Sequence, residues 1–478
     1  MAQIKTEIKT DICVIGAGSG GLSVAAGAAQ MGASTVLIER GAMGGDCLNY
    51  GCVPSKSMLA AARAADTIRH AGRFGVNGHE PQIDFNRVHD HIHGVIAAIA
   101  PNDSVERFEG LGVTVLKSWA KFVDDRTVEA GDARIQARRF VLATGSSAFV
   151  PPIAGIDQTP HLTNETVFEH VAEIRDLVVL GGGPIGVELA QGFARLGAKV
   201  QLVEMARLLP RDDAQAVELV RASLQRDGVA LHEGSAATEL QRAGDRIRLA
   251  IRDAKGEVRW LEGGHLLVAV GRRPRVETMG LEQAGIAATP KGIQVDSGLR
   301  TTNRRVYAIG DCNGGPAFTH VAAHQAGLVI RSALFRLPVS FDARALPWVT
   351  YSDPELAQIG LTEEAARREH DDVVVTHQPA AGNDRARTER HEAGFLKIVS
   401  DRRGRVLGVT IVGVQAGELL APWCLAMARG LKLSAVAGPT LPYPTLSEMG
   451  KRAAGQFYAG RLFSPATRKL VRVLRWFG

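Results

Sequence analysis

The chain has 478 residues, which is too long for one hydrophobic core and predicts three or four domains. Hydrophobic residues make up 45% and charged residues 22%, and no apolar stretch is long enough for a membrane-spanning helix. The net charge of +6 comes from basic residues scattered over most of the chain, and the 5% aromatic content argues against a nucleic-acid partner. Five cysteines are too few for a secreted disulfide framework, and residues 1–10 have no apolar signal core, so we expect a cytoplasmic protein.

The first predicted unit is a strand, a glycine-rich loop, a helix and a second strand that ends on an acid, within residues 11–39. Gly16 and Gly18 permit a tight turn and the close approach of a pyrophosphate, and Gly21 lets the helix pack on the sheet. The helix N-terminus stabilises the phosphate charge, and Glu39 can accept hydrogen bonds from a ribose. This pattern predicts a dinucleotide-binding unit.

The next segment, residues 44–56, reads GGDCLNYGCVPSK and contains Cys47 and Cys52. Two cysteines separated by four residues can bridge across one helical turn, and a disulfide in so short a loop is easy to reduce. The helix that starts here also favours a thiolate at its N-terminal turn. Half of a zinc site and two buried free thiols are the alternatives, but a structural zinc would need more ligands. We therefore favour a redox-active disulfide.

A helical excursion is predicted over residues 83–107, and it carries His89 and His93 four residues apart with His91 between them. That spacing can bind a metal ion. No acidic or cysteine partner is evident in the sequence, so we predict a solvated or interface face and no metal site.

The strand, loop, helix, strand and acid series occurs a second time, with Gly181, Gly183, Gly186 and Glu204 in the equivalent positions. The sequence therefore contains two copies of one dinucleotide-binding unit. A carboxylate suits a free ribose 2′-OH and repels a 2′-phosphate, so Glu204 predicts NADH in preference to NADPH.

Two further strands are predicted over residues 266–270 and 306–309. From residue 346 onward the pattern changes to longer strands and helices without a glycine-rich loop, which predicts a last domain. Of the cysteines outside the 44–56 segment, Cys13 and Cys424 are predicted to be buried structural thiols.

Taken together, these motifs resemble the pyridine nucleotide-disulfide oxidoreductases of the dihydrolipoamide dehydrogenase, glutathione reductase and mercuric reductase group. The resemblance covers nearly the whole chain. Besides the two glycine loops and the GGxCxNxGCxPSK segment, it includes ATG at 143–145, VGRRP at 270–274, IGD at 309–311 and TYSDPELAQIGLTE at 350–363.

The resemblance implies an α/β fold with two Rossmann-like dinucleotide-binding domains, for FAD and NAD, and an α+β C-terminal dimerisation domain. The expected segments are the first part of the FAD domain at 1–152, the NAD(P) domain at 153–273, a return segment of the FAD domain at 274–344 and the interface domain at 345–478. An obligate homodimer follows, because the family builds each active site from two chains.

The family also implies roles for individual residues. Cys47 and Cys52 would form the redox disulfide, with Cys52 nearest the flavin and Cys47 as the interchange thiol that attacks the substrate. Lys56 and Glu188 match an ion pair beside the flavin, where an ammonium stabilises negative charge. The residues implied for FAD are Gly16, Gly18, Gly21, Glu39, Gly45, Lys56, Thr144, Gly145 and Asp311. Those implied for the nicotinamide dinucleotide are Gly181, Gly183, Gly186, Glu204 and Gly271.

The sequence departs from the family near its end. The usual His-Pro-Thr-x-x-Glu run is Tyr443-Pro-Thr-Leu-Ser-Glu448, and both residues are expected to line the partner subunit's substrate side. A phenol is a poorer proton shuttle at neutral pH than an imidazole. Mercuric reductases also have the tyrosine but add a cysteine pair that residues 464–478 do not contain. We expect reduction of a small-molecule or protein-bound disulfide or lipoyl substrate, with mercuric or other metal-ion reduction as one alternative. A quinone-type reductase and a membrane-docked redox sensor are the others.

Residues 464–477 predict a capped amphipathic helix. Ser464 can cap it with Pro465 at its first position. The apolar face contains Leu470, Val473, Leu474 and Phe477, and the basic face contains Arg468, Arg472 and Arg475. Such a helix can lie on an anionic membrane or dock on a partner, or it can pack on its own subunit.

Overall fold

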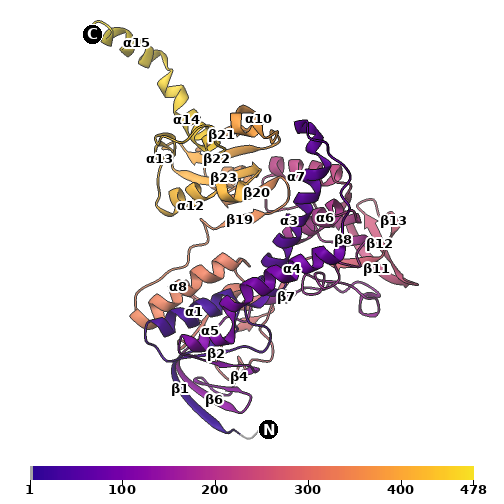
Figure 1. Cartoon of the computed structure of the whole chain (residues 1–478). Helices are drawn as coiled ribbons and strands as arrows, with labels where there is room; N and C mark the ends of the chain where they lie inside the picture. Colours follow the sequence, from indigo (N-terminus) through magenta and orange to yellow (C-terminus); the bar gives the residue numbers. More distant parts are fainter. Residues whose placement is uncertain (1–3, 478) are drawn as a thin grey trace. The chain divides into compact units, whose positions relative to one another are not determined.

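The computed structural model describes residues 4–477, and its chain forms two compact units (Figure 1). The first unit runs up to Met205 and resumes over Ala230–Asp342. The second unit contains Ala206–Val229 and the residues from Ala343 onward. The finer division of the chain at residues 152, 273 and 344 remains a proposal.

Seven strands form the first sheet of the first unit. They are β1 (Thr6–Ile15), β2 (Thr35–Ile38), β3 (Val113–Leu116), β4 (Ala120–Phe122), β5 (Thr127–Ala130), β6 (Ala133–Leu142) and β18 (Val306–Ala308). The order is β3-β2-β1-β6-β5-β4, with β18 also paired to β6. Because β1 runs parallel to both of its neighbours, β2 and β6, the carboxyl ends of these strands meet at one edge of the sheet.

Alternate residues of β1 face two separate apolar cores. Ile12 and Val14 belong to a cluster with residues of α1 (Ser19–Gln30) and α8 (Thr319–Phe335), and these two helices pack on each other. Cys13 and Ile15 belong to a second cluster that includes residues of β4 and β5. A strand that is buried on both faces explains the continuous apolar run in the sequence. Cys13 is fully buried, as predicted, whereas Cys424, also predicted to be buried, is only half-buried.

A second parallel sheet repeats this design in the same unit. Its strands are β8 (Asp176–Leu180), β9 (Lys199–Glu204), β10 (Ala230–Glu233) and β14 (His265–Val268), in the order β10-β9-β8-β14, and α6 (Pro184–Arg195) follows β8. Among the described residues, the same unit contains three smaller sheets. One consists of β11 (Ser235–Ala243), β12 (Arg246–Asp253) and β13 (Val258–Gly263). The other two are the pair β7 (Ser146–Ala148) and β15 (Arg272–Pro274), and the pair β16 (Ala288–Thr289) and β17 (Gly292–Ile293).

Four helices connect β2 to β3. They are α2 (Gly45–Asn49), α3 (Cys52–Arg69), α4 (Phe85–Ile99) and α5 (Val105–Gly110). The helix α3 packs against both α4 and α6. It therefore links the segment that follows the first glycine loop to the helix that follows the second.

The second unit contains a five-stranded antiparallel sheet. Its strands are β19 (Pro347–Thr350), β20 (Glu355–Gly360), β21 (Val373–Pro379), β22 (Phe395–Asp401) and β23 (Val406–Gly413), in the order β19-β20-β23-β22-β21. Its helices are α7 (Ala214–Arg226), α9 (Glu363–Glu369), α10 (Asp384–Thr388), α11 (Ala416–Leu419), α12 (Ala421–Ala428), α13 (Ser434–Ala437), α14 (Glu448–Leu462) and α15 (Pro465–Leu474). Two Rossmann-type sheets and this α+β unit confirm the predicted fold class.

The last helix has the cap that the sequence predicts. The Ser464 hydroxyl oxygen accepts a hydrogen bond from the backbone N–H of Thr467, and Pro465 is the first helical residue. All apolar side chains of α15 from Leu470 to Leu474 are exposed, and so are Trp476 and Phe477 beyond it. Within residues 4–477, none of the helices combines the length and the apolar composition needed to cross a bilayer.

Candidate active site

Two glycines of each nucleotide loop are required by packing inside the protein. A Cβ atom at Gly16, where φ is +104°, would lie 2.4 Å from the carbonyl oxygen of Ala143, and one at Gly21 would lie 1.8 Å from that of Gly16. In the second loop, Gly181 and Gly186 meet equivalent obstacles at 2.4 and 1.9 Å. These glycines hold each turn against its sheet and its helix.

Packing within the protein does not require the middle glycine of each loop, Gly18 or Gly183, to lack a side chain. Gly18 and Gly183 cap α1 and α6 with ordinary φ angles of −82° and −75°. A Cβ at Gly183 would meet nothing within 4 Å, and one at Gly18 would meet only the Cα of Gly45 at 3.9 Å. The open space beside each of these glycines lies at the N-terminus of a helix, where the charge of a pyrophosphate is stabilised. The loops therefore fit two dinucleotides.

The two predicted ribose acids lie against their own loops. Glu39 accepts a hydrogen bond from the backbone N–H of Ala17 at 2.6 Å, and Glu204 accepts one from that of Gly182 at 2.7 Å. Each carboxylate has about four lone-pair sites, so it retains the capacity to accept bonds from ribose hydroxyls. The two acids thus have the same local geometry in both copies.

The two cysteines lie in different helices instead of on one continuous helical turn. Cys47 lies within α2, whereas Cys52 is the first residue of α3. The helical conformation is interrupted between them, and Gly51 is the N-cap of α3. Gly45, at φ +60°, packs so closely on Gly18 that a Cβ would lie 2.6 Å from its Cα. The cysteine segment is therefore held directly against the first glycine loop.

The thiols of the pair are chemically unequal. Both are free thiols in this structure, and the pKa of Cys52 is lowered to about 6, with the hydrogen bond from Cys47 as the largest cause. The Thr319 hydroxyl, 3.6 Å from the Cys52 sulfur, and the nearby charge of Lys56 contribute to this lowering. The same hydrogen bond, together with burial, raises the pKa of Cys47. Cys52 is therefore suited to be the thiolate and Cys47 the thiol that keeps the proton.

Lys56 and Glu188 form an ion pair between α3 and α6, with Lys56 Nζ 2.8 Å from Glu188 Oε2. Glu188 is buried, and Lys56 follows Cys52 by one helical turn. The two helices approach closely because Gly192 has no side chain; a Cβ there would lie 2.5 Å from the terminal methyl of Met58. The fold thus places a cation on the same helix face as the low-pKa thiol.

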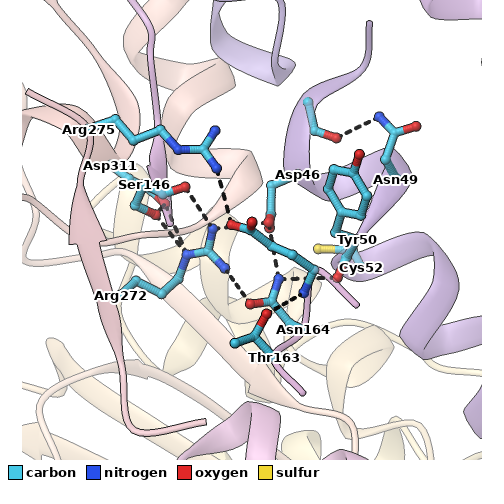
Figure 2. A network of polar contacts seen from close by, with 12 residues as sticks. Asp46, Asn49, Tyr50, Cys52, Ser146, Thr163, Asn164, Arg272, Arg275 and Asp311 are labelled. Atoms are coloured by element: carbon cyan, nitrogen blue, oxygen red, sulfur yellow. Dashed lines mark hydrogen bonds and ion pairs between the residues drawn. The ribbon is translucent and has the colours of Figure 1, made fainter. Parts of the chain in front are cut away.

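Arg272 is the centre of a polar network that the sequence did not predict (Figure 2). Its guanidinium lies 3.0 Å from Asp46 and 3.7 Å from Asp311, donates to the Ser146 hydroxyl at 2.7 Å, and reaches the Asn164 side chain at 3.4 Å. Arg272 belongs to the VGRRP motif, so the sequence could have indicated a role for it. Asn164 belongs to no motif, and nothing in the sequence indicated its role. The network connects Asp46, next to Cys47, to Ser146 and Asp311.

A cavity of about 540 Å³ opens beside Ser146 and Asp311. Arg272, Arg273 and Lys291 give its lining a basic character, which suits an anionic group. Asp311, predicted to contact FAD, therefore lies at the wall of a space that is open to a ligand.

Three further predicted cofactor residues lie in loops at strand ends. The Thr144 hydroxyl donates to the carbonyl oxygen of Arg275 at 2.8 Å. Gly145 and Gly271 have φ angles of +68° and +133°, which side chains disfavour. Both glycines therefore serve the local turn, whatever they contact in a ligand.

Tyr443 and Glu448 lie in the second unit. The Tyr443 side chain is 68% exposed, and its hydroxyl donates to Asp384 at 3.1 Å. This bond and the charge of Asp384 raise the pKa of Tyr443, because both oppose formation of a phenolate. Glu448, at the start of α14, lies 3.9 Å from Arg452.

Comparison with known proteins identifies the family. Residues 10–326 match the pyridine nucleotide-disulphide oxidoreductases, and residues 346–454 match the dimerisation domain of these enzymes. The chain belongs to this family. Its fold, its FAD and pyridine-nucleotide chemistry and its activity as a disulfide oxidoreductase are thereby confirmed, and the dimerisation domain indicates a homodimer.

The relatives of this oxidoreductase have different substrates. It is 35% identical to a dihydrolipoyl dehydrogenase of Haloferax volcanii, over 93% of this chain and 95% of the relative. It is 32% identical to a mercuric reductase of Bacillus cereus, over 95% of this chain and 74% of the relative. The HOCl-induced flavoprotein disulfide reductase RclA of Escherichia coli has a similar structure, with 27% identity, a TM-score of 0.83 and coverage of 93% and 99%.

Proposed function

We propose that this oxidoreductase uses NADH to reduce the Cys47–Cys52 disulfide, and that the resulting dithiol reduces a small-molecule or protein-bound disulfide or lipoyl substrate. The unequal acidity of the two thiols is the observation that supports this proposal. FAD, which Gly16, Gly18 and Asp311 would help to hold, would supply the two-electron transfer from the nicotinamide to the disulfide. One Cys47–Cys52 disulfide becomes two thiols, and one substrate disulfide then becomes two thiols while the protein disulfide forms again.

The neighbouring side chains give the two sulfurs different protonation states and therefore different roles. The charge of Lys56 and the bonds from Cys47 and Thr319 stabilise the Cys52 thiolate, which is suited to face the cofactor. Cys47 keeps its proton and must lose it before its sulfur can attack a substrate disulfide. The reaction with the substrate therefore depends on a base near Cys47.

Tyr443 and Glu448 of the partner subunit are proposed to line the substrate side. The raised pKa of Tyr443 keeps its phenol protonated at neutral pH and therefore unable to accept a proton, so proton removal from Cys47 is the expected slow step. A thiophilic metal ion is the second candidate substrate, because it binds thiolates directly and is less dependent on this base. The identity to mercuric reductases favours this second candidate.

An anaerobic NADH titration tests the electron path. Wild type should develop a long-wavelength charge-transfer band, and Cys52→Ser should lack it. The matched control is Cys424→Ser, which removes a half-buried thiol elsewhere and should keep the band. Direct bleaching of the flavin in all three proteins would contradict the proposal. Acceptor reduction that persists in Cys47→Ser would then favour a quinone-type reductase, and the absence of any acceptor would favour a redox sensor.

The preference for NADH is proposed from Glu204. A carboxylate at the end of β9 repels a ribose 2′-phosphate and accepts bonds from a 2′-hydroxyl. The ratio of kcat/KM for NADH to that for NADPH should exceed one in wild type and fall in Glu204→Gln. An unchanged ratio would show that Glu204 does not select the nucleotide.

We also propose that this otherwise cytoplasmic enzyme touches an anionic membrane surface through residues 464–477. This segment contains Arg468, Lys469, Arg472 and Arg475, has no acidic residue, and exposes its apolar side chains. It lies beyond residue 454, where the match to the family's dimerisation domain ends. Basic residues near an anionic surface contribute about 1 kcal/mol each, and buried apolar side chains add to this.

Vesicle co-sedimentation tests this contact. The full chain should bind phosphatidylglycerol-containing vesicles but not pure phosphatidylcholine vesicles, and deletion of residues 464–478 should abolish binding. Arg468→Glu with Arg472→Glu should weaken it. The matched control is Arg367→Glu with Arg368→Glu, which makes the same charge change on the exposed face of α9. An equal loss of vesicle binding in both double variants would show that binding depends only on net charge. Unchanged binding after the deletion would refute the contact.

A further inference from the structure

Three potential metal ligands meet beside α4. His89 and His93 lie one turn apart on this helix, and their ring centroids are 4.2 Å apart. Glu169 reaches them from a turn that precedes β8, with its Oε2 atom 3.7 Å from His93 Nε2. One ligand atom from each of the three residues lies within 4.8 Å of the others.

The turn that carries Glu169 is anchored on both sides. Val167, Phe168 and Val171 are buried. Farther along, the guanidinium of Arg175 stacks on the ring of Phe85, the first residue of α4, at 3.6 Å. The proximity of Glu169 to the helix therefore follows from packing, and the sequence alone did not place this acid near the histidines.

His93 has a polar atom that needs a partner. Its Nε2 is buried and has no hydrogen-bond partner among the residues that the structure describes. A buried nitrogen without a partner costs free energy, and a coordinated cation would remove that cost. Ligand atoms around a tetrahedral zinc ion lie about 3.3 Å from each other, as expected from metal–ligand distances of about 2.0–2.1 Å. The 3.7 Å separation between Glu169 and His93 is close to this value.

We propose that His89, His93 and Glu169 bind one divalent first-row transition ion, with water in the remaining position. Two imidazole nitrogens and one carboxylate oxygen favour zinc, copper or nickel over magnesium or calcium. The exposed carboxylate of Glu169 can move toward the histidines without disturbing the buried core. The ion would tie α4 to the turn before β8, and the site shares no ligand with the cysteine pair.

Zinc binding to the full chain with bound FAD tests the proposal. The Cys47→Ser, Cys52→Ser double variant is the background, because it removes the thiols that would also bind zinc. Calorimetry and metal analysis after dialysis should give one zinc ion per subunit. His93→Gln and Glu169→Gln should each weaken binding at least tenfold. The control is His91→Gln, which removes an exposed histidine from the same helix and should leave the affinity unchanged.

A second measurement separates binding from a folding defect. Zinc should raise the Tm of the background protein and of His91→Gln, and should leave the Tm of His93→Gln unchanged. An absence of stoichiometric zinc in the background protein would overturn the site. Equal losses in His91→Gln and His93→Gln would overturn it as well. Because the background lacks both thiols, these outcomes are independent of the proposed disulfide chemistry.

Discussion

Replacement of Cys47 by alanine should raise the pKa of Cys52. The hydrogen bond from Cys47 is the largest cause that lowers this pKa from 9.0 to about 6. At pH 7, a thiol with a pKa of about 6 is about 90% thiolate, and one with a pKa of 9.0 is about 1% thiolate. Burial, which raises this pKa, and Thr319 and Lys56, which lower it, all remain in Cys47→Ala, so the pKa of Cys52 should rise clearly above 6.

The assay is alkylation of the reduced protein by iodoacetamide as a function of pH, with Cys52 followed by peptide mass spectrometry. The midpoint of the profile is the readout, because the rate at one pH is misleading. A rise of two pKa units lowers the thiolate fraction at pH 7 about tenfold, while intrinsic nucleophilicity rises by nearly the same factor at a Brønsted slope of about 0.4–0.5.

Wild type should have a midpoint near pH 6, and Cys47→Ala a clearly higher one. Cys47→Ser keeps a hydroxyl that can donate to the thiolate, so its midpoint should lie between them. Cys424→Ala should match wild type. Two results would refute the reasoning: an unchanged midpoint in Cys47→Ala, or a lower midpoint for Cys47 than for Cys52 in wild type.

Three further changes have defined outcomes. Tyr443→His should raise the steady-state rate of lipoamide or disulfide reduction at neutral pH by about 10²-fold or more, because general acid–base catalysis typically contributes 10²–10⁴-fold; no gain would show that Tyr443 does not limit turnover. Burial raises the pKa of Asp212 to about 6 from 3.8, so the stability linked to its proton is fully present below pH 3.8 and is lost as the pH rises through about 6. Asp212→Asn should therefore raise the free energy of unfolding above pH 6 by up to about 3 kcal/mol and flatten its pH dependence in urea titrations. Lys397→Met leaves the buried carboxylate of Asp213, 2.9 Å away, without its cation, and should lower the free energy of unfolding by about 3–5 kcal/mol, with part of the loss restored by Asp213→Asn.

Features that depend on local backbone geometry could be predicted from the amino-acid sequence alone. Gly16 and Gly21 must be glycine because the turn they form leaves no room for a Cβ atom. A few consecutive residues are enough to specify such a turn. The buried strand β1 and the cap of α15 were predictable for the same reason. The family followed from the combination of these short motifs.

The distant residues that act on the reactive groups are known only from the three-dimensional structure. Thr319, which contacts the sulfur of Cys52, follows it by 267 residues, and no spacing rule connects the two. Glu169 meets His93 only because a buried turn packs beside α4, and no sequence pattern indicated that this acid lies near the histidines. The break at Gly51, which places the two cysteines in separate helices, also went unpredicted. Local motifs specify backbone conformation, whereas the pKa of a thiol and the ligands of an ion depend on side chains that only packing brings together.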